Sequence, residues 1–341
     1  MVAPLSSSAL PRALLCSAEE RAALPHGVAQ IAVVGSLNMD VVMRVARAPQ
    51  AGETVLADTL HHIPGGKGGN QAVACLRHGA QVVLMASVGR DHAGNSLRLA
   101  LHAAGMEVDY IQVHEGVPTG TALILIEEDG SNRICVAPGA NAQLALDDDA
   151  LLNVLAPSDF VLLQLETPLA LLQQVLEAAQ STGCRVVLNP SPVLAVPAAW
   201  WPQIHTLVVN EVEAAAYSAL PVTTPQEATH AARLLLAKGV QQVVITLGAQ
   251  GAVAAWRSSA DESAVAISVH AAWPVLVVDT TAAGDTFLGA LVTRLAEGCT
   301  LAQAVDWGIA AASLCISQLG AQPSIPARAT VEAAQATRKL Q

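Results

Sequence analysis

The sequence predicts an α/β fold in three layers, with helices on both faces of a parallel sheet and a small antiparallel sheet set apart from it. From residue 147 onward, short apolar runs alternate with helical patterns, which is typical of parallel sheets. Earlier, two strand-like runs flank an Asp-Gly step at residues 129–130, a hairpin signal. Hydrophobic residues make up 52% of the 341-residue chain and charged residues only 13%, so a large core and a further apolar face are expected.

The first part of the chain is expected to begin with strands and to continue into a helix that follows a Gly-rich loop at residues 64–70. Gly79 and Gly105 are placed to end the two helices expected there. The expected strands are 31–34, 41–45 and 81–88, and the expected helices are 71–78 and 95–104.

The small sheet, or lid, is expected to contain the hairpin runs 121–127 and 133–137, together with 41–45 and 55–61. The domain organisation follows from this. We expect a solvated arm at residues 1–28, a main domain at 29–330 with lid segments near 41–62 and 108–137, and a C-terminal tail at 331–341.

The second part of the chain alternates regularly. Its expected strands are 160–165, 186–188, 206–209 and 243–246, and its expected helices are 169–180, 212–220 and 226–237. Residues 275–278 predict one more buried strand, and a helix is expected from Thr286, with Gly298 as its stop.

Polar residues stand at or just past the ends of the expected strands. In parallel sheets, ligands bind beyond the carboxyl ends of the strands, so one shared site is expected there. The residues in question are Asn38, Glu166, Asn210, Thr246 and Asp279.

The charge and cysteine content limit the partners. The net charge of −11, without a Lys/Arg cluster, argues against nucleic acid and anionic membranes. No apolar run is long enough to span a bilayer. Six scattered cysteines without a CxxC pair indicate a reducing compartment, and we expect the cytoplasm, with organelle import left open by the arm.

The Gly-rich loop fits neither of the common phosphate motifs. Lys67 is followed by Gly68 rather than by Ser or Thr, and Gln71 stands where a dinucleotide fingerprint needs its third glycine. Consecutive glycines let the backbone approach a small polar molecule, and Asn70 can both donate and accept hydrogen bonds. A tight turn without a ligand is the alternative.

Two further stretches each allow two interpretations. The turn at residues 282–284 starts a helix whose free N–H groups would bind an anion, and Asp285 is either a base there or an ordinary first-turn acid. Asn210 and Glu213 either form a capping box or hold waters around Mg²⁺.

Taken in order, five stretches resemble the ribokinase-like (PfkB) sugar kinases. The resemblance runs from about residue 31 to residue 326, and the Gly-Gly-Lys-Gly and Ala-Ala-Gly-Asp sequences are specific when they occur together. The stretches are 35–40 (GSLNMD), 65–72 (GGKGGNQA), 164–168 (QLETP), 210–213 (NEVE) and 279–287 (DTTAAGDTF).

The resemblance implies that ATP phosphorylates D-ribose at its 5-hydroxyl, with Asp285 as the base. The backbone N–H groups of Ala282, Ala283 and Gly284 would form the anion hole. The implied sugar-binding residues are Asn38, Asp40, Gly66, Lys67, Asn70, Glu166 and Asp285. The implied nucleotide-binding residues are Asn210, Thr246, Gly248, Gly251 and Gly284.

The resemblance also implies cofactors and a partner. Mg²⁺ would be held through water by Asn210 and Glu213, and the lid would close over the sugar and form a homodimer. A K⁺ site would use the side chains of Asp279 and Ser324 and the carbonyl groups of Thr281, Cys315, Gln318 and Gly320. Ile309 departs from the polar residue that such kinases often place near adenine.

Other substrates and other classes of protein stay open. Related kinases act on 2-deoxyribose, fructose or nucleosides. Tyr110 is the only aromatic residue of the expected lid, which disfavours a nucleoside. A non-catalytic sugar or nucleotide sensor is the alternative from another class, and Asp285 argues against it.

Overall fold

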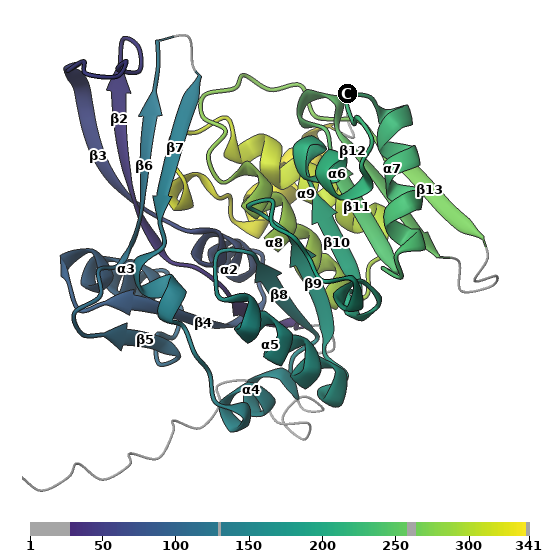
Figure 1. Cartoon of the computed structure of the whole chain (residues 1–341). Helices are drawn as coiled ribbons and strands as arrows, with labels where there is room; N and C mark the ends of the chain where they lie inside the picture. The colour runs from purple at the N-terminus through teal and green to yellow at the C-terminus, as the bar shows by residue number, and fades with distance from the viewer. Residues whose placement is uncertain (1–27, 129–130, 258–263, 339–341) are drawn as a thin grey trace, which may run out of the picture.

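The computed structural model describes residues 28–128, 131–257 and 264–338. Its centre is a nine-stranded sheet, drawn in Figure 1, in which every neighbouring pair is parallel except the two pairs at one edge. In pairing order the strands are β13 (Val265–His270), β12 (Ala252–Arg257), β11 (Gln242–Thr246), β10 (Thr206–Val209), β9 (Arg185–Asn189), β8 (Phe160–Gln164), β1 (Gln30–Val34), β4 (Gln81–Gly89) and β5 (Ile111–His114).

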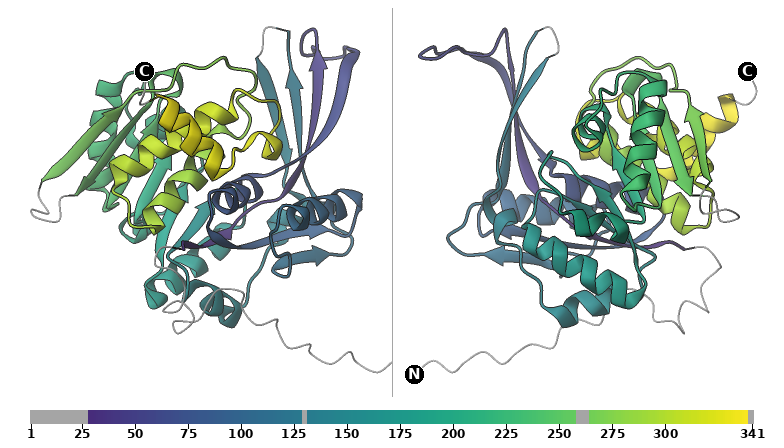
Figure 2. Two further views of the ribbon diagram at one scale, coloured as in Figure 1. Left: turned by 180° about the vertical axis from the view of Figure 1, so that it is seen from behind. Right: turned by 45° about the vertical axis from the view of Figure 1, so that its right-hand side comes forward.

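Helices cover both faces, which confirms the predicted three layers (Figure 2). Alternate side chains of a strand point to opposite faces, so Ala32 and Val34 of β1 join one core while Ile31 and Val33 join the other. The first core is covered by α4 (Asp148–Leu155), α5 (Leu169–Thr182), α6 (Glu211–Ser218) and α7 (Pro225–Ala237). The second is covered by α2 (Lys67–Arg77), α3 (His92–Ala103), α8 (Ala283–Ala296) and α9 (Leu301–Cys315).

The lid is a four-stranded sheet that projects from the main domain (Figure 1). Its order is β3 (Ala57–Gly65), β2 (Asn38–Val45), β6 (Gly120–Ile126) and β7 (Asn132–Ala137). The outer pairs are antiparallel, as expected, and β2 and β6 pair in parallel. The hairpin tip at 129–130 lies outside the described residues.

Two of the expected lid features belong to the main domain instead. The segment near 108–137 begins with β5, which pairs with β4 in the large sheet. Tyr110 packs against the core of the main domain. The lid therefore starts at Gly120 in this part of the chain, and it contains no tyrosine in its strands.

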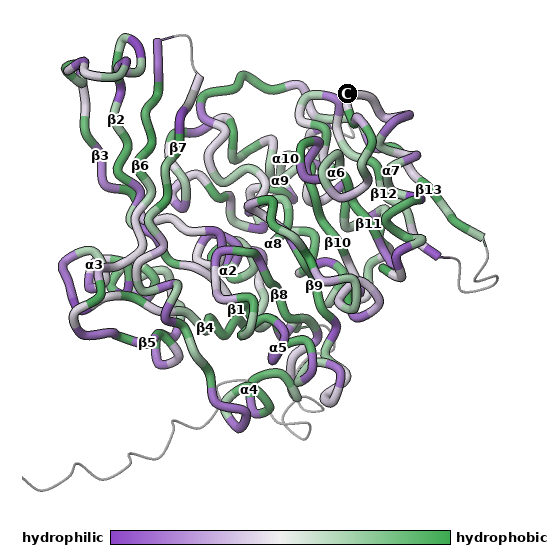
Figure 3. The backbone as a smooth tube through the Cα atoms, viewed as in Figure 1, coloured by the Kyte–Doolittle hydropathy of each residue, from purple (hydrophilic) through white to green (hydrophobic). Residues whose placement is uncertain are grey.

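The prediction of a buried strand at 275–278 is wrong. Leu276 is 82% exposed, and Val277 and Val278 are about half exposed. The edge strand on that side of the sheet is β13, and the run at 275–278, which Figure 3 colours as apolar, pairs with no strand of the described chain. The N–H groups of Val278 and Asp279 donate instead to the carbonyl of Ile316, beyond α9.

The ends of several elements differ from the prediction by a few residues, and two of these differences have a clear structural reason or consequence. Helix α2 begins at Lys67 rather than at residue 71, because Gly66, with φ 87°, turns the chain directly from β3 into the helix. Residues 331–338 of the expected tail belong to α10 (Arg328–Arg338), whose Val331 is buried. The expected arm at 1–28 lies, except for residue 28, outside the described residues.

The central strands are mainly apolar (Figure 3), because both of their faces are covered. Among the helices in the described part of the chain, none is long and apolar enough to cross a membrane.

Helices α2 and α8 pack closely through a glycine. A Cβ on Gly289 of α8 would overlap the Cβ of Ala74 and come within 2.9 Å of the backbone nitrogen of Cys75. The same helix carries Gly284 in its first turn, where a Cβ would meet nothing within 4 Å. The two glycines therefore form a matched pair for a stability test.

We expect Gly289→Ala to lower the free energy of unfolding by about 1–3 kcal/mol, because α2 and α8 must move apart. Gly284→Ala should change it by less than about 0.5 kcal/mol, since its methyl group meets no neighbour. Urea unfolding of both variants checks this, and equal stabilities would contradict the packing argument.

Candidate active site

A cavity of about 240 Å³ lies where the first turns of α2, α6 and α8 meet the carboxyl ends of the strands. The sequence-predicted residues Lys67, Asn210, Glu213, Thr246 and Asp285 all line it. The turn 282–284 does so as well. The cavity thus brings the predicted base, the predicted anion hole and part of the predicted nucleotide site together.

Asp285 is buried in the first turn of α8, with 8% of its surface exposed. Its Oδ2 accepts a hydrogen bond from Nδ2 of Asn70 (3.0 Å), and its Oδ1 accepts one from Nε2 of Gln71 (2.9 Å). Both donors come from α2. The carboxyl group is therefore held by two neutral amide donors where it lines the cavity.

The turn before α8 leaves fewer free N–H groups than the sequence predicted. Ala282 adopts a left-handed conformation (φ 60°), which is strained for a residue with a Cβ. The Ala283 N–H donates to the Thr280 carbonyl (3.2 Å). In the described part of the chain, the N–H groups of Ala282 and Gly284 have no backbone acceptor, and nothing crowds Gly284. These two donors are available to an anion.

Lys67 is a buried cation, and four acidic side chains act on it. Burial alone would lower the pKa of Lys67, but the carboxylates of Asp285, Glu166, Glu213 and Asp40 raise it above its ordinary value. Lys67 is therefore charged in this site. For Asp40, burial is the largest cause that raises the pKa to about 7, and the charges of Glu166 and Asp285 raise it further.

A second cavity of about 470 Å³ lies under the lid and is lined by Asn38 and Glu166. The Oδ1 of Asn38 accepts from Nδ2 of Asn141 (2.8 Å). Glu166 accepts hydrogen bonds from the Ser36 hydroxyl and, at 3.3 Å, from the backbone nitrogen of Lys67. The predicted sugar residues are therefore fixed by the protein before any ligand binds.

Two glycines and one amide complete that region. A Cβ on Gly66 would lie 2.6 Å from the Asn38 nitrogen, so only glycine fits there. A side chain on Gly65 would overlap the carboxylate of Asp40. Within the described chain, the buried Oδ1 of Asn70 has no hydrogen-bond partner, and it is an acceptor that a hydroxyl group can use.

Asn210 and Glu213 form the capping box that the sequence allowed. Asn210 Oδ1 accepts from the Glu213 nitrogen (2.8 Å), and Glu213 Oε2 accepts from the Asn210 nitrogen (3.0 Å). Both side chains also line the cavity. The capping interpretation is confirmed, and it leaves a buried carboxylate facing the cavity.

The other predicted nucleotide residues lie outside this cavity. Gly248 begins the short helix η3 (Gly248–Gln250), and a Cβ on Gly251 would overlap the carbonyl of His270. Gly251 is thus required by the packing of β12 against β13. Ile309 is buried in the core between the sheet and α9.

The two segments predicted for the monovalent cation do meet. Asp279 accepts hydrogen bonds from the nitrogen (2.9 Å) and hydroxyl (2.6 Å) of Thr281 through Oδ1, and from the Gly320 nitrogen (2.9 Å) through Oδ2. Those bonds lower the pKa of Asp279, although burial opposes them. The Sγ of Cys315 lies 3.0 Å from the Ser324 hydroxyl and 3.8 Å from the carbonyl of Thr281.

Sequence reasoning gave no role to several amide side chains of the site. Gln164 donates to Gln71, Asn189 lines the cavity, and Asn141 holds Asn38. Gln71 and Gln164 lie within the stretches 65–72 and 164–168 of the sequence analysis, so their position in the sequence could have indicated a role in the site. Asn141 and Asn189 had no such signal, because their roles depend on tertiary contacts.

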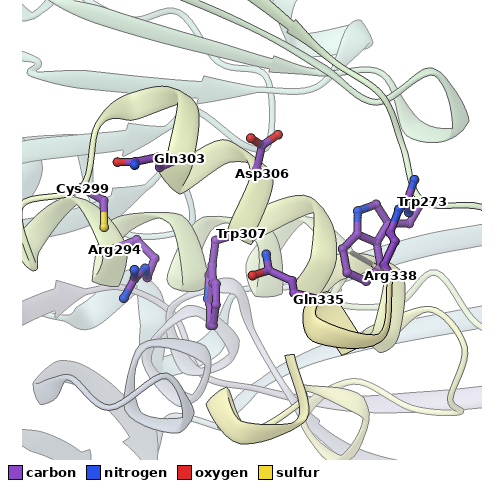
Figure 4. Close-up of a pocket in the computed structure, with 8 residues that line it drawn as sticks. All are labelled: Trp273, Arg294, Cys299, Gln303, Asp306, Trp307, Gln335 and Arg338. Atoms are coloured by element: carbon purple, nitrogen blue, oxygen red, sulfur yellow. The ribbon is translucent and has the colours of Figure 1, made fainter. Parts of the chain in front are cut away.

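A third cavity, of about 560 Å³, lies elsewhere, between α8, α9 and α10 (Figure 4). Its cations are already engaged. Arg294 pairs with Glu297 and lies over the ring of Trp307 at 5.0 Å, and Arg338 lies 4.7 Å above the ring of Trp273. We therefore take the cavity of about 240 Å³, where Asp285 and the helix N-termini converge, as the candidate active site.

The raised pKa of Asp40 predicts a pH-dependent stability. The folded protein keeps the Asp40 proton to about pH 7, whereas the unfolded chain loses it near the ordinary value of 3.8. The contribution of Asp40 to stability therefore falls as the pH rises between these values. We expect the stability gain of Asp40→Asn over the wild type to grow from pH 5 to pH 8. Melting curves at both pH values test this.

Asp58→Asn, at an exposed position of β3, is the control for the Asp40 variant and should show no such trend. A stability difference between Asp40→Asn and the wild type that does not change with pH would contradict the assignment.

Comparisons with known proteins agree with this geometry. The chain is 38% identical over 306 residues to the ribokinase of Bacillus subtilis, covering 89% of this chain and 98% of the relative. It is 31% identical to a deoxyribokinase of Salmonella typhi, covering 87% and 95%. The structure of Arabidopsis thaliana ribokinase complexed with ribose and ATP matches with a TM-score of 0.82, at 31% identity, covering 90% and 98%.

The model of the pfkB family of carbohydrate kinases matches residues 28–328, almost the whole of the described chain. The fold, the lid and the convergence of Asp285 with the turn 282–284 agree with that match. The chain belongs to the pfkB family of carbohydrate kinases.

Proposed function

We propose that the protein transfers the terminal phosphoryl group of ATP to the 5-hydroxyl of D-ribose, giving D-ribose 5-phosphate. The observation that carries this proposal is the buried carboxylate of Asp285, which lies at the same cavity as the free N–H groups of a helix start. The ribokinases of similar sequence and structure support ribose as the sugar.

Asp285 acts as the base that takes the proton of the sugar hydroxyl. Phosphoryl transfer has a loose transition state in most analyses, so an acceptor placed within hydrogen-bonding reach of the hydroxyl is adequate. The carboxylate is already oriented by Asn70 and Gln71. Its position, rather than an unusual basicity, supports the role.

The N–H groups of Ala282 and Gly284 stabilise the negative charge of the transferred phosphoryl group. They point from a helix start, where the helix dipole also favours an anion. The N–H of Ala283 can join them when it leaves the Thr280 carbonyl. Lys67, held charged by its acidic neighbours, adds a positive charge next to the same cavity.

The sugar is held by Asn38, Asp40, Gly66, Lys67, Asn70 and Glu166. Asn38 and Glu166 line the space under the lid, and Asn70 offers its unpaired oxygen. Paired donors and acceptors of this kind suit a polyol. The lid covers the sugar and keeps water from the reaction.

The lid also forms a homodimer. Its strands expose the apolar side chains Leu60, Leu123, Ile134 and Val136, which a second copy can bury. A cytoplasmic enzyme agrees with the free cysteines Cys75, Cys135, Cys299 and Cys315.

Mg²⁺ accompanies ATP, and Asn210 and Glu213 hold its water. The carboxylate of Glu213 faces the cavity, and oxygen donors of this type suit a hydrated Mg²⁺. The ion neutralises charge on the phosphates of ATP. Thr246, Gly248, Gly251 and Gly284 contact the nucleotide. Of these, Thr246 and Gly284 line the same cavity.

A monovalent cation, K⁺ in particular, binds between the segments 279–281 and 315–324. Asp279 and Ser324 supply side-chain oxygens. The hydrogen bonds that Asp279 accepts from Thr281 and Gly320 support the proximity of the two segments. The carbonyl groups of Thr281, Cys315, Gln318 and Gly320 complete the site. An ion there orders the turn that leads into Asp285.

We expect Asp285→Asn to lower kcat by about 10²–10⁴-fold, the usual contribution of a general base. Binding of ribose and ATP, measured by calorimetry, should be retained because their other contacts remain. Asp109→Asn, an exposed acid of the main domain, is the control. Near-normal turnover of Asp285→Asn would remove this residue from its role.

The substrate is tested by following ATP consumption with ribose, 2-deoxyribose, fructose and adenosine. Ribose should give the highest kcat/KM. A higher value for another sugar would reassign the substrate, and binding without turnover would favour a sensor.

Replacing K⁺ by Na⁺ should lower kcat/KM, because the carbonyl cage orders the turn before Asp285 best around the larger ion. Asp279→Ala should remove the difference between the two salts. Rates in matched ionic strength check this. Equal rates of the wild type in both salts would contradict the cation site.

A further inference from the structure

Gln71 is a buried side chain that is not among the residues proposed to contact the sugar or the nucleotide, although it donates to the proposed base. It belongs to α2 and is 0% exposed, and its side chain contacts residues of β8, β9 and α8. Its Nε2 donates to Oδ1 of Asp285 (2.9 Å) and to Oδ1 of Asn189 (3.3 Å), and its Oε1 accepts from Nε2 of Gln164 (2.6 Å). Both polar atoms are thus engaged by the protein, so Gln71 is not a sugar ligand.

The orientation of this amide is fixed from two sides. An ionised carboxylate such as that of Asp285 only accepts hydrogen bonds, so the atom of Gln71 that faces it is the nitrogen, and the oxygen of Gln71 then faces the nitrogen of Gln164. Asn189 uses its own nitrogen to donate to the carbonyl of Val208 (3.0 Å), so its oxygen is turned toward the nitrogen of Gln71. If the Gln71 amide were reversed, its nitrogen would face the nitrogen of Gln164. Its oxygen would face the oxygens of Asp285 and Asn189, and none of these contacts could be a hydrogen bond.

Asp285 is the end point of this chain of hydrogen bonds. Asn70 and Gln71 are successive residues of α2, and each donates to a different oxygen of the carboxylate. Two donors on two oxygens fix the rotation of the carboxyl group about its own bond, whereas one donor leaves it free to turn. Chains of amides that end on a charged acceptor also strengthen one another.

We propose that Gln71 is a positioning residue that fixes the rotation of the Asp285 carboxylate, and that Gln164 acts through Gln71. The inference rests on the proposed role of Asp285. It predicts a loss of turnover without a loss of substrate binding, because Gln71 touches the base and not the ligand.

Gln71→Met tests this with a side chain of similar length that cannot donate. We expect kcat to fall about 10- to 100-fold, the loss that a misplaced catalytic group produces. The KM values for ribose and ATP should stay unchanged. In an Asp285→Ala background the same substitution should cause no further loss, since its effect passes through Asp285.

Gln164→Met is the second variant, because it leaves Gln71 and Asp285 in place and removes only the donor that orients the amide. Its kcat should fall less than that of Gln71→Met, again at unchanged KM. Gln30→Met is the matched control: Gln30 is also a 0% exposed glutamine, and it lies at the start of β1, away from the cavity. Its kcat should equal that of the wild type.

The outcomes separate the two proposals. A wild-type protein without turnover on any sugar overturns the proposed function, and the positioning role with it. With an active wild type, three results overturn the positioning role alone. These are a normal kcat in Gln71→Met, a raised KM at normal kcat, and an equal loss with and without Asp285. Melting temperatures of all variants show that they are folded.

Discussion

The carboxylate of Asp285 joins the two helices whose first turns form the site. It accepts hydrogen bonds from two successive residues of α2 while it belongs to α8. A buried charge of this kind is stable only where donors surround it, so α2 and α8 must keep one relative position. Gly289 permits that position by letting the helices approach. The proposed base, the proposed anion-binding turn and the Gly-rich segment are therefore parts of one packed unit.

The same unit concentrates negative charge. Asp40, Glu166, Glu213 and Asp285 all act on Lys67, and the single cation does not balance four acids. The raised pKa of Asp40 is one result of this imbalance. A bound cation, such as the metal ion proposed to accompany ATP, would offset part of this negative charge.

Much of the architecture could be predicted because its signals are local. Alternating apolar runs gave the parallel sheet, and the capping box at Asn210 and Glu213 was visible in four residues. The run at 275–278 failed because an apolar stretch does not reveal whether the sheet has room for it. The roles of Asn141 and Asn189 depend on partners more than 18 residues away in the chain, such as Asn38 and Val208, and no pattern marks such contacts.

Strand β2 extends from Asn38, which lines the cavity under the lid, to Val45 in the outer part of the lid. Asp40 lies on the same strand, and its carboxylate has space because Gly65 of the neighbouring strand β3 has no side chain. One strand therefore belongs both to the lining of the cavity and to the sheet that projects above it. A substitution that shifts the backbone of β2 near Asn38 is consequently expected to change the position of the lid as well as the cavity.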